Sequence, residues 1–533
     1  MHWDFPYASQ RMPVMAGNVV ATSQPLAAQA GLRMLLAGGN AVDAAIATAI
    51  ALTVVEPCNN GIGGDAFAIV WDGRKLHGLN SSGRSPRAWT RERFDRYDTM
   101  PLRGWDSVTV PGAPAAWTAL SKRFGRLDFE ALFQPAIEYA RDGFVVSPRT
   151  AEGWAHSRKA FAAFPEFIEA FCPRGRAPRC GEYFAQKDQA RTLRQIARTH
   201  GEAFYRGALA KRIAKHAKAT GGVMTVDDLA AHEARWVDTI AQPYAGCHLH
   251  EIPPNGQGLA ALIMLGILKR LNIRQYPVDS ADSLHAQIEA MKLAFADAHR
   301  YIADPAAMRV SVKQLLSARY LKQRAALIDM SKAQRFSWGE LRERGTVYLA
   351  AADARGMMVS MIQSNYHGFG SGVVIPGTGI AMQNRGAGFT LERGHANEVG
   401  GGKQPYHTII PGFVMRRGEP VMAFGVMGGP MQPQGHAQMM VRIFDYGQNP
   451  QAASDAPRWR VIDDRRVAIQ PGLHRRVYAE LSRRGHKLER KHDPVSFGGA
   501  QLIYRLDDGY VAASDWRKDG QAVGYCRPAT RIA

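Results

Sequence analysis

Residues 344–372 read "RGTVYLAAADARGMMVSMIQSNYHGFGSG". Two runs rich in strand-forming residues, 346–353 and 357–364, flank a turn that contains Gly356. A glycine-rich loop follows the second run. This pattern predicts a β-hairpin whose first strand begins at a Gly-Thr pair.

The pair Gly345-Thr346 has a possible chemical meaning. A threonine hydroxyl is a poor nucleophile unless a base removes its proton, and a free α-amine with a pKa near ~8 can act as that base. Thr346 would have a free α-amine only if the chain cut itself between Gly345 and Thr346. Gly345 has no Cβ and leaves room for the hydroxyl to reach the preceding carbonyl. Gly-Thr pairs are common, so the alternative is a threonine that simply starts a strand.

The charge of the chain is strongly basic but dispersed. The 533 residues include 67 Lys and Arg against 47 Asp and Glu, a formal net charge of +20. A basic chain can bind nucleic acid. Here the basic residues form only short runs of mixed sign, which favours a general basic surface for solubility or anionic solutes. We therefore expect no nucleic-acid partner.

Cysteine use and hydropathy indicate a cytoplasmic protein without membrane contact. The five cysteines match no zinc pattern. Cys172 and Cys180 could pair, although free thiols in a reducing compartment are favoured. The N-terminus lacks a basic start followed by an apolar core, and no apolar run reaches the ~18 residues of a membrane span.

Residues 25–57 predict two helices. The first ends at the pair Gly38-Gly39, Asn40 caps the second, and the second stops before Pro57. Its many alanines predict a buried helix that packs closely against a sheet. Residues 58–86 come next, with a glycine turn, a strand "AFAIVW" (66–71), an Asp-Gly turn and a second strand, which predicts a hairpin.

The rest of the chain changes character at Thr346. Residues 107–240 and 281–305 are largely helical in pattern, and 306–343 read as an exposed helical arm. Strands and hairpins dominate after Thr346. The order predicts an α+β fold with sheets between helix layers. No glycine-rich segment fits a dinucleotide or P-loop template, and HExxH is absent.

Several segments together resemble the γ-glutamyltransferase family of N-terminal-nucleophile hydrolases. They are "GGNAVDAAIATAIALTVVEPCNNGIGGDAF" (38–67), "VTVPGAPAAW" (108–117), "EAMKLAFADAHRYIADP" (289–305), "FGSGVVIPGTGIAMQNRGAGF" (369–389), "KQPYHTIIP" (403–411) and "FGVMGGP" (424–430). The resemblance implies an αββα four-layer sandwich. It also implies a precursor cut into a large subunit, 1–345, and a small subunit, 346–533, which form a heterodimer; further dimerisation is left open. No metal and no cofactor are implied.

The resemblance also implies catalytic roles. The family's nucleophile begins a T-T-H-x-S-V-V-D run, which here reads "TVYLAAAD", so Thr346 matches the nucleophile. Ser364 matches the hydroxyl that supports it. Gly428 and Gly429 match the pair whose amides form the oxyanion hole. The alternative for the glycine pair is a tight turn between a strand and a helix.

The residues that hold glutamate in the family are different here. The family's arginine, asparagine, acid and paired serines correspond to Ser82, Tyr366, Gly388, and His407 with Thr408. Arg84 lies two positions after Ser82. In the same run, "QNRGAGF", Arg385 follows Asn384, and Gly388 stands in place of the family's acid. The subsite, which is the part of the pocket that holds glutamate in the family, has therefore lost its acid and gained a cation.

This exchange predicts an anion in the subsite. We expect Arg385 and Asn384 to contact a substrate carboxylate, with Arg84, Tyr366, His407 or Thr408 assisting. The pattern is most similar to the oxamate amidohydrolases of the family, so a small carboxylate-bearing amide such as oxamate is the predicted substrate. A salt bridge that orders the loop is the structural alternative for Arg385.

Three other functions stay open at this point. They are a γ-glutamyltransferase or glutathione hydrolase, a cephalosporin-type acylase with a large pocket, and an uncleaved, inactive binding protein. The sequence does not decide between hydrolysis and transfer.

Overall fold

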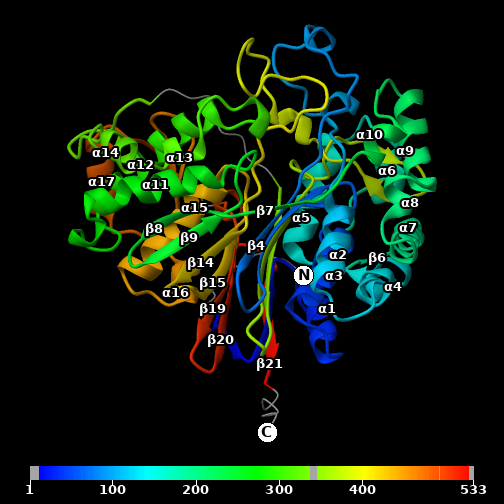
Figure 1. Cartoon of the computed structure of the whole chain (residues 1–533), viewed down its shortest axis with the longest axis horizontal. Helices are drawn as coiled ribbons and strands as arrows, with labels where there is room; N and C mark the ends of the chain where they lie inside the picture. Colours follow the sequence, from blue (N-terminus) through cyan, green and yellow to red (C-terminus); the bar gives the residue numbers. More distant parts are fainter. Residues whose placement is uncertain (1–10, 337–344, 491–492, 527–533) are drawn as a thin grey trace.

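The computed structural model describes residues 11–336, 345–490 and 493–526. In this part of the chain, two antiparallel sheets lie face to face between two layers of helices (Figure 1). This arrangement confirms the predicted α+β sandwich of four layers.

The first sheet contains the predicted hairpin at its centre. Its strands run in the order β21 (Gln521–Tyr525), β2 (Asn18–Thr22), β10 (Val347–Ala352), β11 (Met358–Ser364), β3 (Asp65–Trp71), β4 (Leu76–Ser81) and β7 (Arg235–Val237). β10 and β11 form the hairpin, with Val347 opposite Gln363. Strands that precede Thr346 and strands that follow it are therefore interleaved in one sheet.

The second sheet has the same mixed origin. Its order is β1 (Val14–Ala16), β20 (Gly509–Ser514), β19 (Ala500–Leu506), β15 (Glu419–Val426), β14 (Gly412–Arg416), β9 (Cys247–Glu251) and β8 (Ile240–Tyr244). The two sheets pack through a core that includes Phe67, Tyr348, Phe413 and Ile503. Along β10, successive side chains point alternately into this core and toward the first helix layer, as a strand buried on both faces requires.

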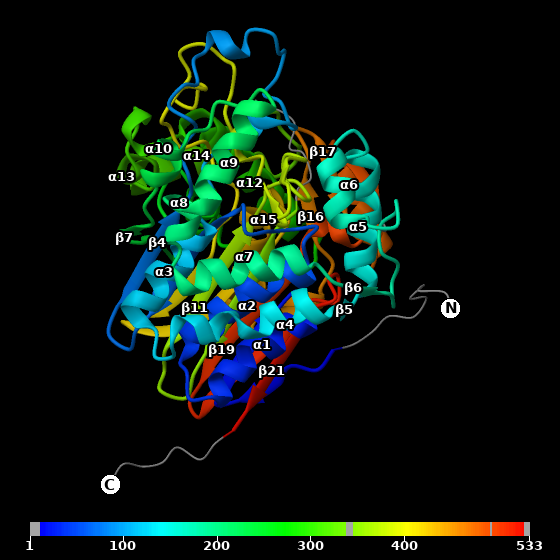
Figure 2. The ribbon, with the colours of Figure 1, turned by 90° about the vertical axis from the view of Figure 1, so that its right-hand side faces the viewer.

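The first helix layer confirms the reading of residues 25–57. It contains α1 (Pro25–Leu36), α2 (Ala41–Val55), α3 (Ala113–Phe124), α4 (Gln134–Asp142) and α7 (Lys187–Arg198). Asn40 and Asp43 form a capping box at the start of α2. Every residue of α2 is buried, because small side chains allow close approach to the sheet. Figure 2 shows these helices over the strands.

The second helix layer covers the other sheet. It is built on α11 (Gly258–Leu271), α12 (Ala281–Tyr301), α15 (Met431–Met440) and α17 (Arg475–Arg483). The prediction of an exposed helical arm after residue 305 is correct only in part, because most of residues 306–336 are exposed or half-buried but a few side chains are buried. Leu321 and Ala325 of α14 (Ala318–Ala325) are buried in the same hydrophobic cluster as α11. Residues 337–344 of the predicted arm lie outside the described residues.

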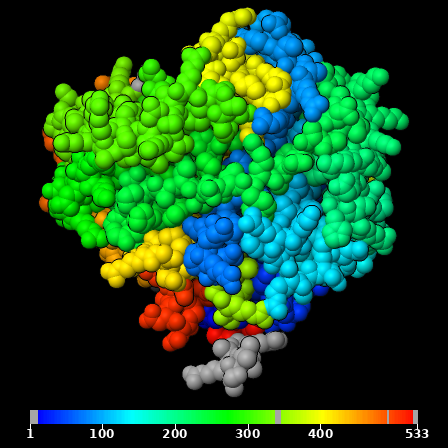
Figure 3. Space-filling view, in the orientation of Figure 1, coloured from blue at the N-terminus to red at the C-terminus, as the bar shows by residue number. Residues whose placement is uncertain are grey.

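Two long excursions, residues 86–106 and 389–402, lie against each other at the top of the molecule (Figure 3). A small cluster of Trp89, Phe94, Met100, Phe389 and Val399 joins them. Trp89 also packs directly on the backbone of the turn η6 (Arg385–Gly388). The excursions therefore cover the segment that carries Arg385.

None of the helices in the described part of the chain combines the length and the apolar character needed to span a bilayer. All five cysteines are free thiols, so Cys172 and Cys180 do not pair.

Candidate active site

Thr346 lies directly before β10 and beside Ser364, the last residue of β11. Its side-chain Oγ1 donates a hydrogen bond to the carbonyl oxygen of Gly345 at 2.7 Å. Ser364 Oγ donates to the same oxygen at 2.9 Å and lies 3.4 Å from Thr346 Oγ1. The fold therefore places the hydroxyl of Thr346 against the peptide bond that self-cleavage would break.

Gly345 is tightly enclosed. A Cβ at this position would lie 2.7 Å from Oδ1 of Asn59 and 3.1 Å from the backbone nitrogen of Gly368. Asn59 is held in place because its Nδ2 donates to the buried carboxyl of Glu56 at 2.6 Å. Burial raises the pKa of Glu56. The packing gives a physical reason for a glycine before Thr346.

Gly428 and Gly429 join β15 to α15. Both adopt positive φ, 114° and 58°, which favours glycine. Their amides find no acceptor among the described residues, and they lie at the N-terminal end of α15, where the helix dipole favours negative charge. Gln257 Nε2 donates to the carbonyl of Gly429 at 2.9 Å and helps to fix the turn. The pair can stabilise an oxyanion near Thr346.

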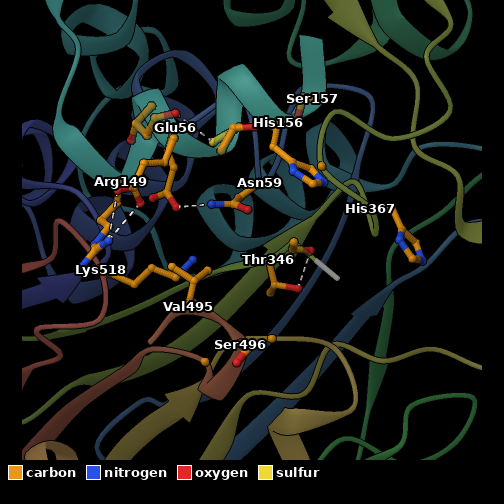
Figure 4. Close-up of a pocket in the computed structure, with 18 of the residues that line it drawn as sticks. Glu56, Asn59, Arg149, His156, Ser157, Thr346, His367, Val495, Ser496 and Lys518 are labelled. Carbon is orange, nitrogen blue, oxygen red and sulfur yellow. Dashed lines mark hydrogen bonds and ion pairs between the residues drawn. The ribbon is translucent and has the colours of Figure 1, made fainter. Parts of the chain in front are cut away.

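An open cavity of about 420 Å³ brings Thr346 and Gly428 together. Figure 4 shows Thr346 at its centre, with His156 and Ser157 of α5 (Pro148–Ala160) on one side. Glu56, Asn59 and Lys518 lie on another side. Further lining residues that the sequence reasoning missed are Arg103, Arg149, Phe161, His367, Arg460 and Asp519. They carry no motif and come from distant segments.

Arg385 is fully buried and is not among the residues that line this cavity; the same holds for Asn384, Tyr366, His407 and Thr408. Nη1 of Arg385 donates to Thr408 Oγ1 at 2.8 Å, and its guanidinium lies 4.1 Å from the centre of the Tyr366 ring. Nε and Nη2 meet no acceptor in the described part of the chain, and no carboxylate there forms an ion pair with Arg385. Burial lowers its pKa to about 9, so the side chain stays charged at neutral pH.

The other two residues next to this subsite have structural contacts. Tyr366 has a positive φ of 82°, and its backbone N–H donates to Ser364 Oγ at 2.8 Å. Asn384 accepts from the backbone N–H of His367 at 3.0 Å and donates to the carbonyl of Leu102 at 3.0 Å. Asn384 thus joins the loop after β11 to the 86–106 excursion.

His407 faces Asp65. Its Nε2 lies 3.0 Å from an Asp65 carboxyl oxygen, and its Nδ1 accepts from the backbone N–H of Ile409 at 3.4 Å, so Nε2 carries the proton. Burial and the charge of Arg385 hold the pKa of His407 well below its usual range. Burial raises the pKa of Asp65 to about 7, against the opposing effect of Arg385. His407 therefore supports the subsite as a neutral side chain.

Arg84 lies apart from these residues. It lines a second cavity of about 190 Å³ and forms an ion pair with Asp304 at 2.7 Å. The structure does not bring Arg84 to the cavity that holds Thr346. Ser82, which stands at the family's arginine position, is buried and bonded to Asn80 and Asn255.

The four-layer fold with a threonine at the head of a central strand and a glycine pair beside it defines the class of N-terminal-nucleophile hydrolases. A family model described as "Gamma-glutamyltranspeptidase" matches residues 27–525. The chain belongs to the γ-glutamyltranspeptidase family, and it is an amide hydrolase or transferase of that class.

The relatives carry different substrate names. A glutathione hydrolase-like proenzyme of Bacillus subtilis is 37% identical, covering 95% of this chain and 98% of its own. An oxamate amidohydrolase proenzyme of Klebsiella pneumoniae is 36% identical, covering 94% and 97%. The crystal structure of a cephalosporin acylase from Bacillus halodurans is 48% identical, covers 98% and 99%, and has a TM-score of 0.95. The family is thus shared, while the substrate differs among similar proteins.

Proposed function

We propose that this protein is a self-processing threonine amidohydrolase whose substrate carries a carboxylate on the acyl side of the scissile amide, oxamate being the smallest example. The observation that carries the proposal is the buried guanidinium of Arg385, with two nitrogen donors, Nε and Nη2, that have no acceptor in the described residues. Buried polar groups are nearly always hydrogen-bonded, so an empty pair of donors indicates the place of a ligand. A carboxylate matches their planar geometry.

Self-cleavage would activate the enzyme. Thr346 Oγ1 attacks the carbonyl carbon of Gly345, the C–N bond breaks, and the freed nitrogen becomes the α-amine of Thr346. Water then hydrolyses the resulting ester and leaves a carboxylate on Gly345. The hydrogen bonds of Thr346 and Ser364 to this carbonyl support the step. The fragments 1–345 and 346–533 would stay together as a heterodimer.

Turnover would use the same hydroxyl. The α-amine of Thr346 takes the hydroxyl proton while Oγ1 attacks the substrate carbonyl. The amides of Gly428 and Gly429 stabilise the oxyanion, and one such donor is commonly worth about 3 kcal/mol. The amine returns the proton to the leaving nitrogen as the C–N bond breaks. Water then releases the acid from the ester and restores Thr346.

The subsite disfavours a γ-glutamyl substrate. An α-ammonium group requires a carboxylate or several acceptors when it is buried. Here the nearby cation is Arg385, and Gly388 stands where the family has its acid. The buried carboxyl of Asp65 lies near Arg385 but is already engaged by His407 and Gln383. The ammonium would be repelled by the guanidinium. This supports an amide without a free α-amine.

An acylase is the second candidate. The cavity of about 420 Å³ in front of Thr346 exceeds the needs of oxamate, and the 48% identical cephalosporin acylase supports a larger substrate. A longer acyl chain that ends in a carboxylate could also reach Arg385. The two candidates therefore differ in acyl length.

Three 4-nitroanilides separate the candidates through the release of 4-nitroaniline. The oxalyl anilide has a shorter acyl chain than the other two. The glutaryl and γ-glutamyl anilides have the same chain length and differ only in the α-amine. We expect the oxalyl anilide to have the highest kcat/KM, together with ammonia release from oxamate. Preference for the glutaryl anilide would favour the acylase, and preference for the γ-glutamyl anilide would overturn the proposal.

Arg385→Met tests the carboxylate contact. Loss of a hydrogen-bonded charge pair costs about 1.5–3 kcal/mol, so kcat/KM for the oxalyl anilide should fall by roughly 10- to 150-fold. Intact mass spectrometry of the variant would show whether processing is retained. An unchanged kcat/KM in a processed variant would contradict the role of Arg385.

A further inference from the structure

Arg103 is a second arginine with no acid partner, and it lines the cavity that contains Thr346. Its Nη1 donates to the carbonyls of Gly370 and Leu102, at 3.0 and 3.3 Å. Nε and Nη2 make no hydrogen bond to any described residue, and no carboxylate there forms an ion pair with it. Burial alone lowers its pKa.

Two other cations of the cavity, Arg149 and Lys518, have different surroundings. Arg149 is paired with Glu152 at 2.9 Å. Lys518 lies close enough to Glu56 for its charge to oppose the effect of burial on that carboxyl. Arg103 instead lies over the ring of Phe161, 4.3 Å from its centre. An aromatic face beside a cation with free donors is suited to a ligand group that is both anionic and apolar.

The backbone segments that carry Arg103 and Arg385 lie next to each other, but the two side chains have different surroundings. Their neighbours Leu102 and Asn384 are hydrogen-bonded to each other at 3.0 Å. Arg385 is buried against Tyr366 and Thr408. Arg103 extends into the open cavity. The open cavity that Arg103 lines has room for a larger amine than ammonia.

We propose that Arg103 binds a carboxylate on the amine side of the scissile bond, so that the preferred substrate is an N-acyl amino acid with one carboxylate on each side of the amide. This inference rests on the proposed function, because it takes Arg385 as the anchor of the acyl carboxylate. Phe161 would pack against the side chain of the amino acid. Hydrolysis of N-oxalylphenylalanine would consume one water and give oxalate and phenylalanine.

The test compares N-oxalylphenylalanine with N-oxalylphenethylamine, which lacks only the carboxylate on the amine side. Products are quantified by chromatography. We expect kcat/KM to be roughly 10- to 100-fold higher for the amino acid conjugate. This ratio corresponds to the binding free energy of one hydrogen-bonded charge pair. Equal values for the two substrates would overturn the assignment of Arg103.

Arg103→Met and Arg103→Gln should abolish the preference while N-oxalylphenethylamine is still hydrolysed. Arg91→Met is the matched control, because Arg91 lies on the same excursion and is paired with Asp95 at 2.7 Å. The control should keep the preference. A preference that survives in both Arg103 variants would also overturn the inference.

The two proposals fail in different ways. If oxamate and N-oxalylphenethylamine are hydrolysed without any preference for the carboxylate on the amine side, only the role of Arg103 is wrong. If neither oxalyl amide is hydrolysed and γ-glutamyl-4-nitroanilide is, the carboxylate subsite at Arg385 is wrong as well.

Discussion

At the scale of the residue, chemistry depends on a few oxygen atoms around one peptide bond. The pairing of Val347 with Gln363 places Thr346 beside Ser364. Both hydroxyls then reach the carbonyl of Gly345. Neither side chain is reactive by itself, so their common position at the strand ends is what makes a nucleophile possible.

Thr346→Ala should prevent self-cleavage, because it removes the attacking oxygen. We expect a single chain of 58.5 kDa by intact mass spectrometry, where the unchanged protein gives two fragments. Thr346→Ser keeps a hydroxyl and should still cleave. Two fragments from the alanine variant would contradict the mechanism of activation.

Gly345→Ala should slow self-cleavage, because its Cβ would lie 2.7 Å from Oδ1 of Asn59. Overpacking of this kind costs about 1–3 kcal/mol, which is roughly a tenfold or greater loss of rate if the strain is felt in the transition state. A time course of the precursor on denaturing gels measures it. Gly17→Ala is the control, since its Cβ would meet only Ala354 Cβ at 3.9 Å. Equal rates for both variants would contradict this reading.

At the scale of the element, the nucleophile strand is fixed at its far end by a helix. Asp353, which follows β10, accepts a hydrogen bond from the first amide of α2, Ala41, at 2.9 Å. α2 is buried along its whole length. A carboxylate at a helix N-terminus is favourable, so the contact holds β10 in register and with it the position of Thr346.

The second helix layer contains a buried histidine pair that links α12 to the turn between α17 and β18 (Lys487–Arg490). His285 Nδ1 lies 2.8 Å from His486 Nε2, and His285 Nε2 donates to the carbonyl of Asp329 at 3.0 Å. Burial lowers the pKa of His285 to about 4 and that of His486 to about 2. Both side chains are neutral in the folded protein at neutral pH.

This pair predicts acid sensitivity. The unfolded chain binds protons at these histidines below pH ~6.5, whereas the folded chain does not, so stability falls as the pH drops from ~6.5 toward 4, by about 1.4 kcal/mol per unit for each histidine. His285→Gln should melt below the unchanged protein at pH 7, with a smaller difference at pH 5. Melting curves across this range measure it. A difference that is independent of pH would contradict the prediction.

At the scale of the whole molecule, the proposed cleavage would divide the chain without dividing the fold. β10 and β11 lie between β2 and β3 in one sheet, and β1 pairs with β20 in the other. Each sheet therefore contains strands from both sides of Thr346. Separation of the fragments would expose strand edges and both apolar sheet faces.

We expect the two fragments to co-elute in size-exclusion chromatography and to separate only in denaturant. Segments 1–345 and 346–533, each produced alone, should fail to give soluble protein, because each lacks strands from the centre of a sheet. Native mass spectrometry should show the fragments in equal numbers. A soluble, monomeric single fragment would contradict the interlocked arrangement.

Several local features were predictable because they depend on neighbouring residues. The hairpin after Thr346, the capped alanine-rich helix and the strand before Gly428 all follow from periodicity and turn chemistry. The exposed arm was predicted correctly only in part, because the burial of Leu321 depends on contact with α11. Arg84 was selected by its position in a motif, although its pairing with Asp304 comes from a distant segment.

The sequence by itself determined the fold class, the family and the identity of the candidate nucleophile, because these are written in local patterns and in the order of motifs. Only the tertiary structure decided which charges lack a partner. Arg103 and Arg385 look like many other arginines in the chain. Folding places Arg103 beside the ring of Phe161 and two carbonyls. It places Arg385 beside the ring of Tyr366, with Asp65 near enough to act on its charge but not in an ion pair. Burial makes an unsatisfied charged donor costly, which is the physical reason that Arg385 indicates a ligand. Arg103 is half-buried, and its position in the cavity wall is what indicates a ligand there.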